Sequence, residues 1–129
     1  MSRNADDNDK RQIERGREVL RKEIAALETA REGLGPSFAE AVRRVAACRG
    51  HVIVTGLGKA GLIGRKITAT LNSTGTRAVD LHPVEALHGD LGMVEPMDIV
   101  LALSNSGESD ELLRLLPAMK EGGTQIILI

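Results

Sequence analysis

Two segments of this chain repeat one order of elements: a short apolar run, a loop that contains glycine, and a helical pattern. The first run is His51–Thr55, and Gly56-Leu57-Gly58-Lys59-Ala60-Gly61 follows it. The second run is Ile99–Leu103, and Ser104-Asn105-Ser106-Gly107-Glu108-Ser109 follows it. A short continuous apolar run is typical of a parallel strand that is buried on both faces. Because free backbone N–H groups gather where such a loop enters a helix, both loops are candidate anion sites.

Two further runs complete the predicted sheet. Arg77–Leu81 and Gln125–Ile129 can each form a strand, and a helix is expected over about residues 109–121. The helix after the first loop carries Ile63, Ile67, Thr70 and Leu71 at helical spacing. Strands that alternate with helices predict an α/β fold, a three-layer doubly wound parallel sheet of the flavodoxin or Rossmann type. Ligands of such sheets bind at the carboxyl ends of the strands, where both loops lie.

The first fifty residues are predicted to be helical. An apolar stripe recurs at helical spacing on Ile13, Val19, Leu20, Ile24, Leu27 and Leu34. Gly33-Leu34-Gly35-Pro36 interrupts the pattern, and Ser37 with Glu40 predicts the capping box of a second helix. That second helix is expected to turn inward Phe38, Val42, Val45 and Ala46. We therefore divide the chain into 1–50, a helical segment that packs on the sheet or on a dimer partner, and 51–129, the sheet domain.

Composition excludes several classes of partner. The net charge of −1 gives no basic field for nucleic acid or an anionic membrane. Phe38 is the single aromatic residue, so the stacking platforms of RNA-binding proteins are missing. The charged N-terminus has no apolar core of a signal peptide, and no run of about twenty apolar residues occurs. Cys48, the one cysteine, has no pairing partner in the chain and predicts a buried structural thiol in a reducing, cytoplasmic compartment.

The chain ends inside its own pattern. Ile126–Ile129 is a strand of the buried type, whereas a complete sheet of this class continues through at least one more helix and strand. We therefore expect the first part of a longer, incomplete domain, which is expected to be inactive on its own.

The first loop also fits the dinucleotide fingerprint Gly-x-Gly-x-x-Gly, with Asp80 about twenty residues further on, where a ribose hydroxyl would bind. Two features disfavour this alternative. A second anion loop would be redundant for a pyrophosphate that the first loop already holds. Lys59 would also place a charge inside a turn chosen for close backbone approach.

The second half of the chain resembles a known family. Gly-Leu-Gly-Lys-Ala-Gly-Leu-Ile-Gly-Arg-Lys at 56–66, Ser-Thr-Gly-Thr at 73–76, His-Pro-Val-Glu-Ala-Leu-His-Gly-Asp-Leu-Gly-Met-Val at 82–94 and Ser-Asn-Ser-Gly-Glu-Ser at 104–109 are similar to the sugar isomerase (SIS) domain of arabinose-5-phosphate isomerases. The resemblance covers about residues 15–129, and its His-Gly-Asp-Leu-Gly-Met-Val block is specific to this branch.

This resemblance implies an intramolecular oxidoreductase that interconverts D-arabinose 5-phosphate and D-ribulose 5-phosphate without a cofactor. In the family this reaction feeds the synthesis of Kdo and lipopolysaccharide. Members usually continue into the rest of the SIS domain and a pair of CBS modules. The implied partners are a pentose phosphate and further copies of the chain, as a dimer or tetramer.

Isomerisation through an enediol needs a positioned base and positive charge where the enediolate forms. Glu111, in the first turn of its predicted helix, is a candidate base or proton carrier. Lys59 is a candidate electrophile or phosphate contact, and both residues match catalytic positions of the family. Short hydrogen-bond donors for the substrate come from Ser104, Asn105, Ser106 and Ser109.

The resemblance also places Gly75, Thr76, His82 and His88 at the substrate site, and His88 is expected to take part in catalysis as well. His82 is a possible metal ligand, but two histidines without a third ligand do not make a metal site, so none is predicted.

Position 60 departs from the family, because Ala60 stands where Ser is common and one possible phosphate hydroxyl is lost. A sugar-phosphate-sensing module of a transcription regulator is the alternative function, since such a module shares the serine loop but does not need Glu111 or Lys59.

Overall fold

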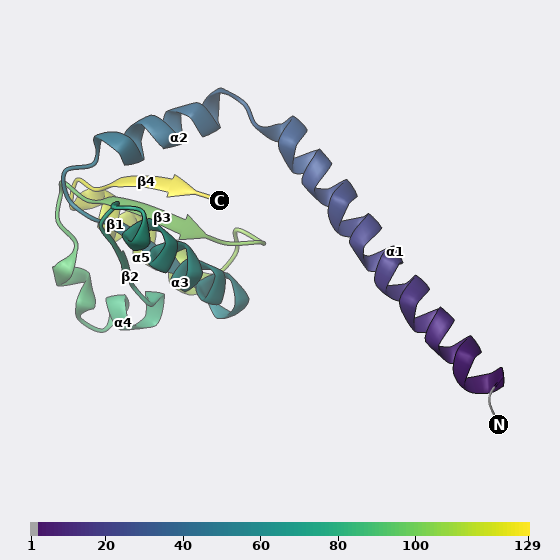
Figure 1. The fold of residues 1–129 in the computed structure, drawn as a ribbon. Helices are drawn as coiled ribbons and strands as arrows, with labels where there is room; N and C mark the ends of the chain where they lie inside the picture. The colour runs from purple at the N-terminus through teal and green to yellow at the C-terminus, as the bar shows by residue number, and fades with distance from the viewer. Residues whose placement is uncertain (1–2) are drawn as a thin grey trace. The chain divides into compact units, whose positions relative to one another are not determined.

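The computed structural model describes residues 3–129, which form two compact units divided between Ala39 and Glu40. Helix α1 (Arg3–Gly33) belongs to the first unit, and helix α2 (Pro36–Ala47) crosses the division. The second unit contains the sheet and its helices (Figure 1). Within residues 3–129 no helix combines the length and the apolar character that crossing a membrane requires.

The sheet has four parallel strands in the order β2-β1-β3-β4. Their bounds are β1 Val52–Gly56, β2 Ala78–Asp80, β3 Ile99–Leu103 and β4 Gln125–Leu128. Each strand lies where the apolar runs predicted it. β1 is buried along its whole length, whereas the edge strand β4 is exposed or half-buried, which fits its single neighbour.

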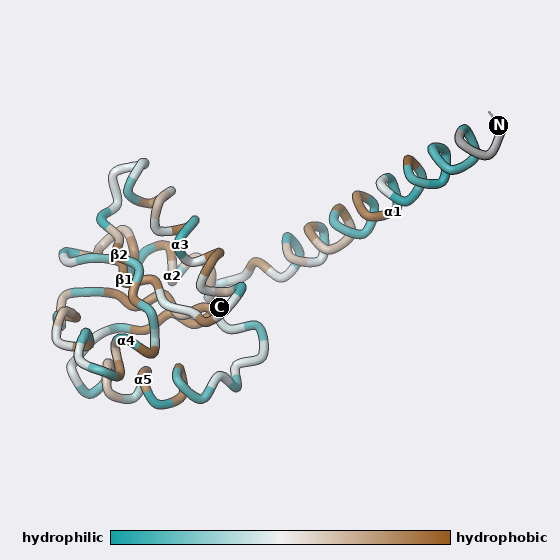
Figure 2. The backbone as a smooth tube through the Cα atoms, turned by 90° about the horizontal axis from the view of Figure 1, so that it is seen from below, coloured by the Kyte–Doolittle hydropathy of each residue, from teal (hydrophilic) through white to brown (hydrophobic). Residues whose placement is uncertain are grey.

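Helices cover both faces of this sheet (Figure 2). They are α3 Gly58–Ser73, α4 Pro83–Leu87, the 3₁₀ turn η1 Asp90–Met93, and α5 Asp110–Glu121. One apolar cluster joins Val52, Val54 and Leu103 to Ile67 and Leu71 of α3 and Val45 of α2. The other joins Ile53, Val100 and Ala102 to Ala86 of α4 and to Leu115 and Met119 of α5. Alternate residues of one strand therefore face opposite layers, and the predicted three-layer α/β architecture is confirmed.

The strand order explains why α3 and α5 lie on opposite faces. The chain moves from β1 to β2 in one direction across the sheet, and from β3 to β4 in the other. Because crossovers between parallel strands are right-handed, opposite directions place their helices on opposite faces. The order reverses between β1 and β3, and ligands of open α/β sheets bind at this switch point.

Helix α3 contacts the sheet through Ile67 and Leu71 of its apolar pattern and through small residues that carry no such signal. Ile63 is 58% exposed, whereas Gly61, Gly64 and Thr68 form the buried face. A Cβ atom at Gly64 would lie 3.2 Å from Cγ1 of Val54, so this position brings helix and strand close together. Apolar periodicity does not register a contact face made of glycine, so the spacing of Ile63, Ile67 and Leu71 did not reveal this part of the contact.

The capping box predicted from Ser37 and Glu40 was also wrong. Helix α2 begins at Pro36, two residues before the start that a cap at Ser37 implies, so Ser37 lies inside its first turn. Proline suits this first position because its missing N–H would have no intrahelical partner. The Glu40 carboxylate instead accepts hydrogen bonds from Arg44 at 2.7 Å and from Arg43 at 2.7 Å, and these two contacts hold the pKa of Glu40 below its ordinary value.

The inward face predicted for α2 is confirmed at Val45 alone. Val45 packs on the cluster beneath α3. Phe38 is 53% exposed, Val42 is 50% exposed, and Ala46 is exposed as well.

Candidate functional site

The loops that follow β1 and β3 enclose a pocket at the switch point of the sheet. The pocket has a volume of 310 Å³ and is lined by Leu57, Lys59, Ala60, Leu103, Ser104, Asn105, Ser106 and Ser109. The structure thus brings Lys59 together with all four polar residues predicted for the serine loop. They meet because β1 and β3 are paired in register from Val52 and Ile99 to Gly56 and Leu103, so their carboxyl ends coincide.

Close glycine packing sets the shape of the first loop. A Cβ atom at Gly61 would lie 2.6 Å from the carbonyl oxygen of Gly56, so α3 can approach its own strand only with glycine here. Gly58 has a φ of 54°, a left-handed conformation that glycine adopts without strain. Helix α3 then begins without a side-chain cap at Leu57, and its first N–H groups have no intrahelical partner.

Serine side chains shape the second loop. The Ser104 Oγ accepts a hydrogen bond from the backbone N–H of Gly107 at 2.9 Å, and the Ser106 Oγ accepts one from Glu108 at 3.2 Å. A hydroxyl carries one proton and two acceptor lone pairs, so an oxygen that accepts here still has its proton to donate. The loop therefore presents hydroxyl donors beside the pocket while its own backbone is held in place.

Helix α5 begins at this loop and adds a partial positive charge. Ser109 lies at the N-cap with no side-chain bond to the helix, and its carbonyl accepts from Leu113 at 2.9 Å. The N–H groups of the first turn are consequently free, and an anion is favoured at this end of the helix. Glu111 lies in the same turn and is half-buried, but it does not line the pocket.

A second hollow of 400 Å³ lies on the other side of the first loop, and Lys59 lines both. Arg65, Asp80 and His82 contribute to this second hollow. The Arg65 guanidinium lies 4.0 Å from the Asp80 carboxylate. The His82 ring caps α4, because its Nδ1 accepts a hydrogen bond from the N–H of Val84 at 3.3 Å. His82 therefore has a structural contact, and its other ring nitrogen stays available to a ligand.

Three other predicted site residues lie elsewhere in the chain. His88 is an exposed residue at the C-cap of α4 and lines neither hollow. Gly75 and Thr76 precede β2 and line a small hollow with Gly50 and Val52, at the amino ends of the strands. Within one chain the structure does not bring Gly75 and Thr76 to Lys59, and their role stays a prediction. In the described residues no group of three or more His, Cys, Asp or Glu side chains could hold a metal ion.

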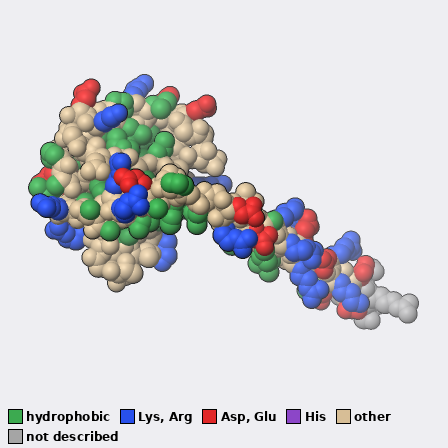
Figure 3. All heavy atoms as spheres, turned by 90° about the horizontal axis from the view of Figure 1, so that it is seen from above, with side chains coloured by type: hydrophobic (Ala, Val, Ile, Leu, Met, Phe, Trp, Pro, Cys, Tyr) green, Lys and Arg blue, Asp and Glu red, His purple; other side chains and the backbone are tan. Residues whose placement is uncertain are grey.

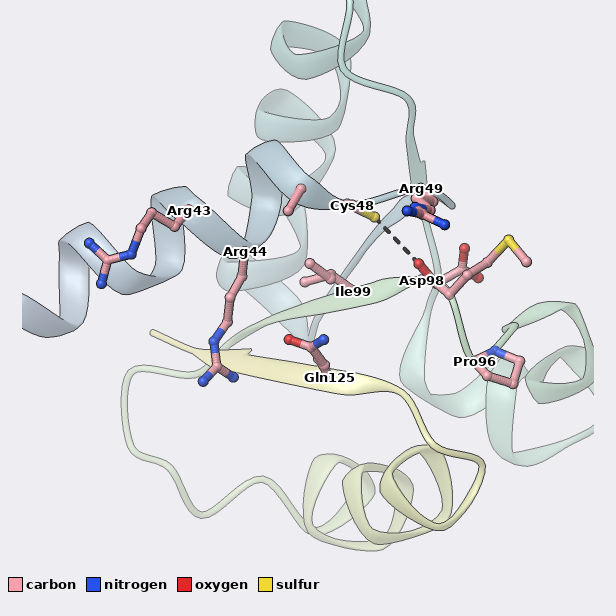
Figure 4. Close-up of a pocket in the computed structure, with 10 residues that line it drawn as sticks. Arg43, Arg44, Cys48, Arg49, Pro96, Asp98, Ile99 and Gln125 are labelled. Carbon is pink, nitrogen blue, oxygen red and sulfur yellow. Dashed lines mark hydrogen bonds between the residues drawn. The ribbon is translucent and has the colours of Figure 1, made fainter.

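At the amino-terminal ends of the strands lies a buried polar residue, Asp98, that the sequence analysis did not single out. The Asp98 carboxylate is 2% exposed and accepts hydrogen bonds from the N–H groups of His51 at 2.7 Å and Glu95 at 2.8 Å. Those contacts fix the starts of β1 and β3. Cys48 was predicted to be a buried structural thiol, and here it is half-buried, with its sulfur 3.6 Å from the carbonyl oxygens of His51 and Met97. Figure 4 shows this thiol with one of its hydrogen bonds as a dashed line. The pocket here carries no predicted site residue.

Comparisons with known proteins show the family to which the chain belongs. The SIS domain model matches residues 46–129. The arabinose 5-phosphate isomerase KdsD of Yersinia pestis is 49% identical over 114 residues, which cover 88% of this chain and 34% of that protein. The isomerase KpsF of Escherichia coli O6:H1 is 46% identical over the same length, covering 88% of this chain and 35% of its own. The chain thus spans about a third of the length of these curated relatives.

Solved structures share the fold. The E. coli CFT073 protein c3406 in complex with A5P superposes with a TM-score of 0.84 and 40% identity, covering 90% of this chain and 62% of that one. The sugar isomerase domain of the RpiR transcription factor from Sphaerobacter thermophilus has a TM-score of 0.72 and 21% identity, covering 86% of this chain and 63% of its own, which shows a common fold. The resemblance predicted from the motifs is confirmed, and the chain belongs to the SIS domain family.

Proposed function

We propose that this chain forms part of an aldose–ketose isomerase that interconverts D-arabinose 5-phosphate and D-ribulose 5-phosphate through an enediol. The observation that carries the proposal is the pocket that Lys59 shares with the serine loop at the switch point. A cation, several hydroxyl donors and a helix N-terminus converge there, which is the donor set that a small phosphorylated sugar needs. The relatives named arabinose 5-phosphate isomerase, and the c3406 complex with A5P, support this substrate class.

The phosphate is assigned to the serine loop. Ser104 and Ser106 keep their hydroxyl protons for a ligand, as their oxygens accept from the loop backbone. Asn105 and Ser109 line the same pocket, and the free N–H groups of α5 favour the negative charge. Hydrogen bonds to a charged group contribute about 1.5–3 kcal/mol each, so this loop supplies much of the affinity.

Proton transfer is assigned to Glu111 and charge stabilisation to Lys59. A base removes the proton from the carbon beside the aldehyde, and negative charge develops on the enediolate oxygens. One proton then passes from the neighbouring hydroxyl oxygen to the former aldehyde oxygen, and a proton is returned to the former aldehyde carbon. Lys59 reaches the pocket and can stabilise that charge. Glu111 lies two residues after Ser109 but does not line the pocket. Its role therefore requires that the carboxylate and the substrate come together when the substrate binds. His82, His88, Gly75 and Thr76 complete the proposed substrate site.

The proposal extends to the setting of the reaction. The chain acts in the cytoplasm as a homo-oligomer, with no nucleic acid or membrane as partner, and its reaction supplies arabinose 5-phosphate to Kdo and lipopolysaccharide synthesis. The net charge of −1 and the single cysteine support this setting.

A comparison of binding with turnover tests the proposal. Wild type and Glu111→Gln are incubated with arabinose 5-phosphate in deuterated water, and NMR follows both ribulose 5-phosphate formation and deuterium uptake at the carbon beside the carbonyl. An isomerase shows both signals in wild type, and Glu111→Gln loses them about 10²–10⁴-fold while it retains binding. A wild-type chain that binds no pentose phosphate would contradict the proposal, and deuterium uptake that Glu111→Gln leaves unchanged would remove this residue from proton transfer.

A further inference from the structure

Most ion pairs of the described residues join side chains of one helix. Figure 3 shows Lys and Arg side chains beside Asp and Glu along α1, where the Lys10 ammonium lies 3.3 Å from the Asp6 carboxylate. Asp80 differs from these exposed acids. Its ion-pair partner Arg65 lies on another element, and both side chains line the 400 Å³ hollow beside the loop after β1. Asp80 is therefore an acid in a concave place, where ligands of proteins usually bind.

The Asp80 carboxylate keeps its capacity to accept hydrogen bonds. Asp80 ends β2 and pairs in register with Val54 of β1, so it lies at the carboxyl end of the sheet. The Arg65 guanidinium is 4.0 Å away, beyond hydrogen-bond distance, and within residues 3–129 no donor forms a hydrogen bond with this carboxylate. An ionised carboxylate has about four acceptor sites on its two oxygens. These sites are available to the donors of a ligand.

The two hollows beside the loop after β1 offer different chemistry. The pocket at the serine loop is lined by Lys59 and by hydroxyl and amide side chains, with no carboxylate among its lining residues. The second hollow contains an acceptor, Asp80, beside Lys59, Arg65 and His82. A phosphate carries up to two negative charges and acceptor oxygens, so a neighbouring carboxylate disfavours it. A sugar hydroxyl can donate its proton to that carboxylate, so the second hollow suits the sugar and the first pocket suits the phosphate.

Lys59 connects the two hollows, since it lines both. Gly56, Gly58 and Gly61 also line the second hollow, so a ligand can approach the loop backbone closely at these positions. A sugar held by its phosphate at the serine loop can therefore extend past Lys59 toward Asp80. In the dinucleotide fingerprint an acid at this spacing accepts a hydrogen bond from a ribose hydroxyl, and an open sugar chain presents hydroxyls of the same kind.

We propose that Asp80 binds hydroxyl groups of the sugar and is a specificity-determining residue for polyhydroxylated phosphates. Arg65 is the positioning residue that keeps the Asp80 carboxylate in the hollow. The proposal rests on the proposed function, because it takes the phosphate to lie at the serine loop. It supplies the charged acceptor that the lining of the serine-loop pocket lacks.

Calorimetry with two ligands and the full chain tests the proposal. Asp80→Ala should raise the dissociation constant for arabinose 5-phosphate about ten- to a hundredfold, because hydrogen bonds to a charged group are lost. The dissociation constant for inorganic phosphate should stay at its wild-type value, since phosphate binds in the other pocket. Asp80→Asn keeps the shape of the side chain without its charge and should lie between Asp80→Ala and wild type.

Glu121→Ala is the matched control for the loss of one negative charge. Glu121 is exposed at the end of α5 and lines neither hollow, so this variant should bind both ligands as wild type does. Arg65→Gln should weaken the binding of arabinose 5-phosphate less than Asp80→Ala does, because Arg65 acts through Asp80. The substituted side chains are all exposed, so each variant should keep the fold, which circular dichroism checks.

The possible failures are distinguishable. An unchanged affinity of Asp80→Ala for arabinose 5-phosphate, in a chain whose wild type binds this sugar, would overturn the proposal and leave the proposed function in place. Tighter binding of inorganic phosphate by Asp80→Ala would also overturn it, since the phosphate would then lie beside Asp80. A larger loss in Arg65→Gln than in Asp80→Ala would show that Arg65 is the ligand contact. A wild-type chain that does not bind arabinose 5-phosphate would contradict this proposal and the proposed function together.

Discussion

The two loops that form the pocket are held in place by different means. In the loop after β1 the backbone packs against itself, since only glycine at position 61 leaves room for the carbonyl of Gly56. In the loop after β3 the hydroxyls of Ser104 and Ser106 hold the backbone N–H groups of Gly107 and Glu108. The first loop thus keeps its shape because only glycine fits at its tight contact. The second loop keeps its shape through serine hydroxyls that are also proposed to bind the ligand. Substitution of a packed glycine in the first loop should therefore affect stability, whereas substitution of a serine in the second loop should affect binding.

The largest expected effect is on stability, from Gly61→Ala. The new Cβ would meet the Gly56 carbonyl oxygen at 2.6 Å, a backbone atom that cannot move without displacing β1 or α3. We expect a loss of about 3 kcal/mol in the free energy of unfolding, measured by urea denaturation. Gly64→Ala is the matched control, because its Cβ would meet side-chain atoms at 3.2 and 3.3 Å that can shift, and it should cost about 1 kcal/mol. Equal stabilities of the two variants would contradict the claim that backbone packing at Gly61 fixes the first loop.

Lys59→Met should affect binding and leave stability unchanged. The side chain is exposed and lines both hollows, so its loss removes charge from the ligand without disturbing the core. We expect the dissociation constant for arabinose 5-phosphate, measured by calorimetry, to rise about ten- to a hundredfold. Lys66→Met, at an exposed position of the same helix, serves as the control and should bind as wild type does. A normal affinity in Lys59→Met would remove this residue from the site.

Ser104→Ala should affect both properties of the second loop. It removes a donor to the ligand and the acceptor that holds the N–H of Gly107 at 2.9 Å. We expect affinity to fall about tenfold, with a small change in the unfolding midpoint because the loop is only partly buried. Ser106→Ala, whose hydroxyl accepts at the longer distance of 3.2 Å, should weaken binding less. The reverse ranking would show that loop geometry does not govern affinity.

Ala60→Ser should strengthen binding, and its effect is the smallest of the series. Ala60 lines the pocket, and the family commonly has serine at this position. A new hydroxyl there adds one hydrogen bond to the phosphate, and we expect an affinity gain of up to about tenfold. Calorimetry with inorganic phosphate beside arabinose 5-phosphate checks the reason, since both ligands should gain alike. A gain in affinity for arabinose 5-phosphate without a gain for inorganic phosphate would show that the new hydroxyl contacts the sugar and not the phosphate.

Local sequence patterns predicted the elements better than they predicted contacts. Ile99–Leu103 was bounded correctly because a continuous apolar run between turn residues has few alternatives to a buried strand. The contact face of α3 was only partly indicated by the sequence: Ile67 and Leu71 do pack on the sheet, but Gly61 and Gly64 contribute close approach and no hydropathy. Helix α2 begins at Pro36, ahead of the expected cap, because proline suits the first helical position at no cost.

The sequence predicted the site residues that follow the carboxyl ends of neighbouring strands. It did not predict the positions of residues at the opposite, amino-terminal ends of the strands. Lys59 and Ser104 follow strands that the structure pairs directly, so the rule for parallel sheets brought them together. Gly75 and Thr76 were assigned to the site only by resemblance to the family, which identifies residues but does not show where they lie in this chain. In the structure they lie at the amino-terminal ends of the strands. Asp98 gave no signal because a single acid before a strand resembles any solvated turn residue.

A thermal melt with added ligands tests the central claim most directly. The chain is heated alone, with arabinose 5-phosphate, with ribulose 5-phosphate, and with NAD. A ligand that binds only the folded state raises the midpoint in proportion to RT ln(1 + [L]/Kd). The pocket of Lys59 and the serine loop predicts a rise with both pentose phosphates and none with NAD. A rise with NAD alone would contradict the isomerase account and restore the dinucleotide alternative through Asp80.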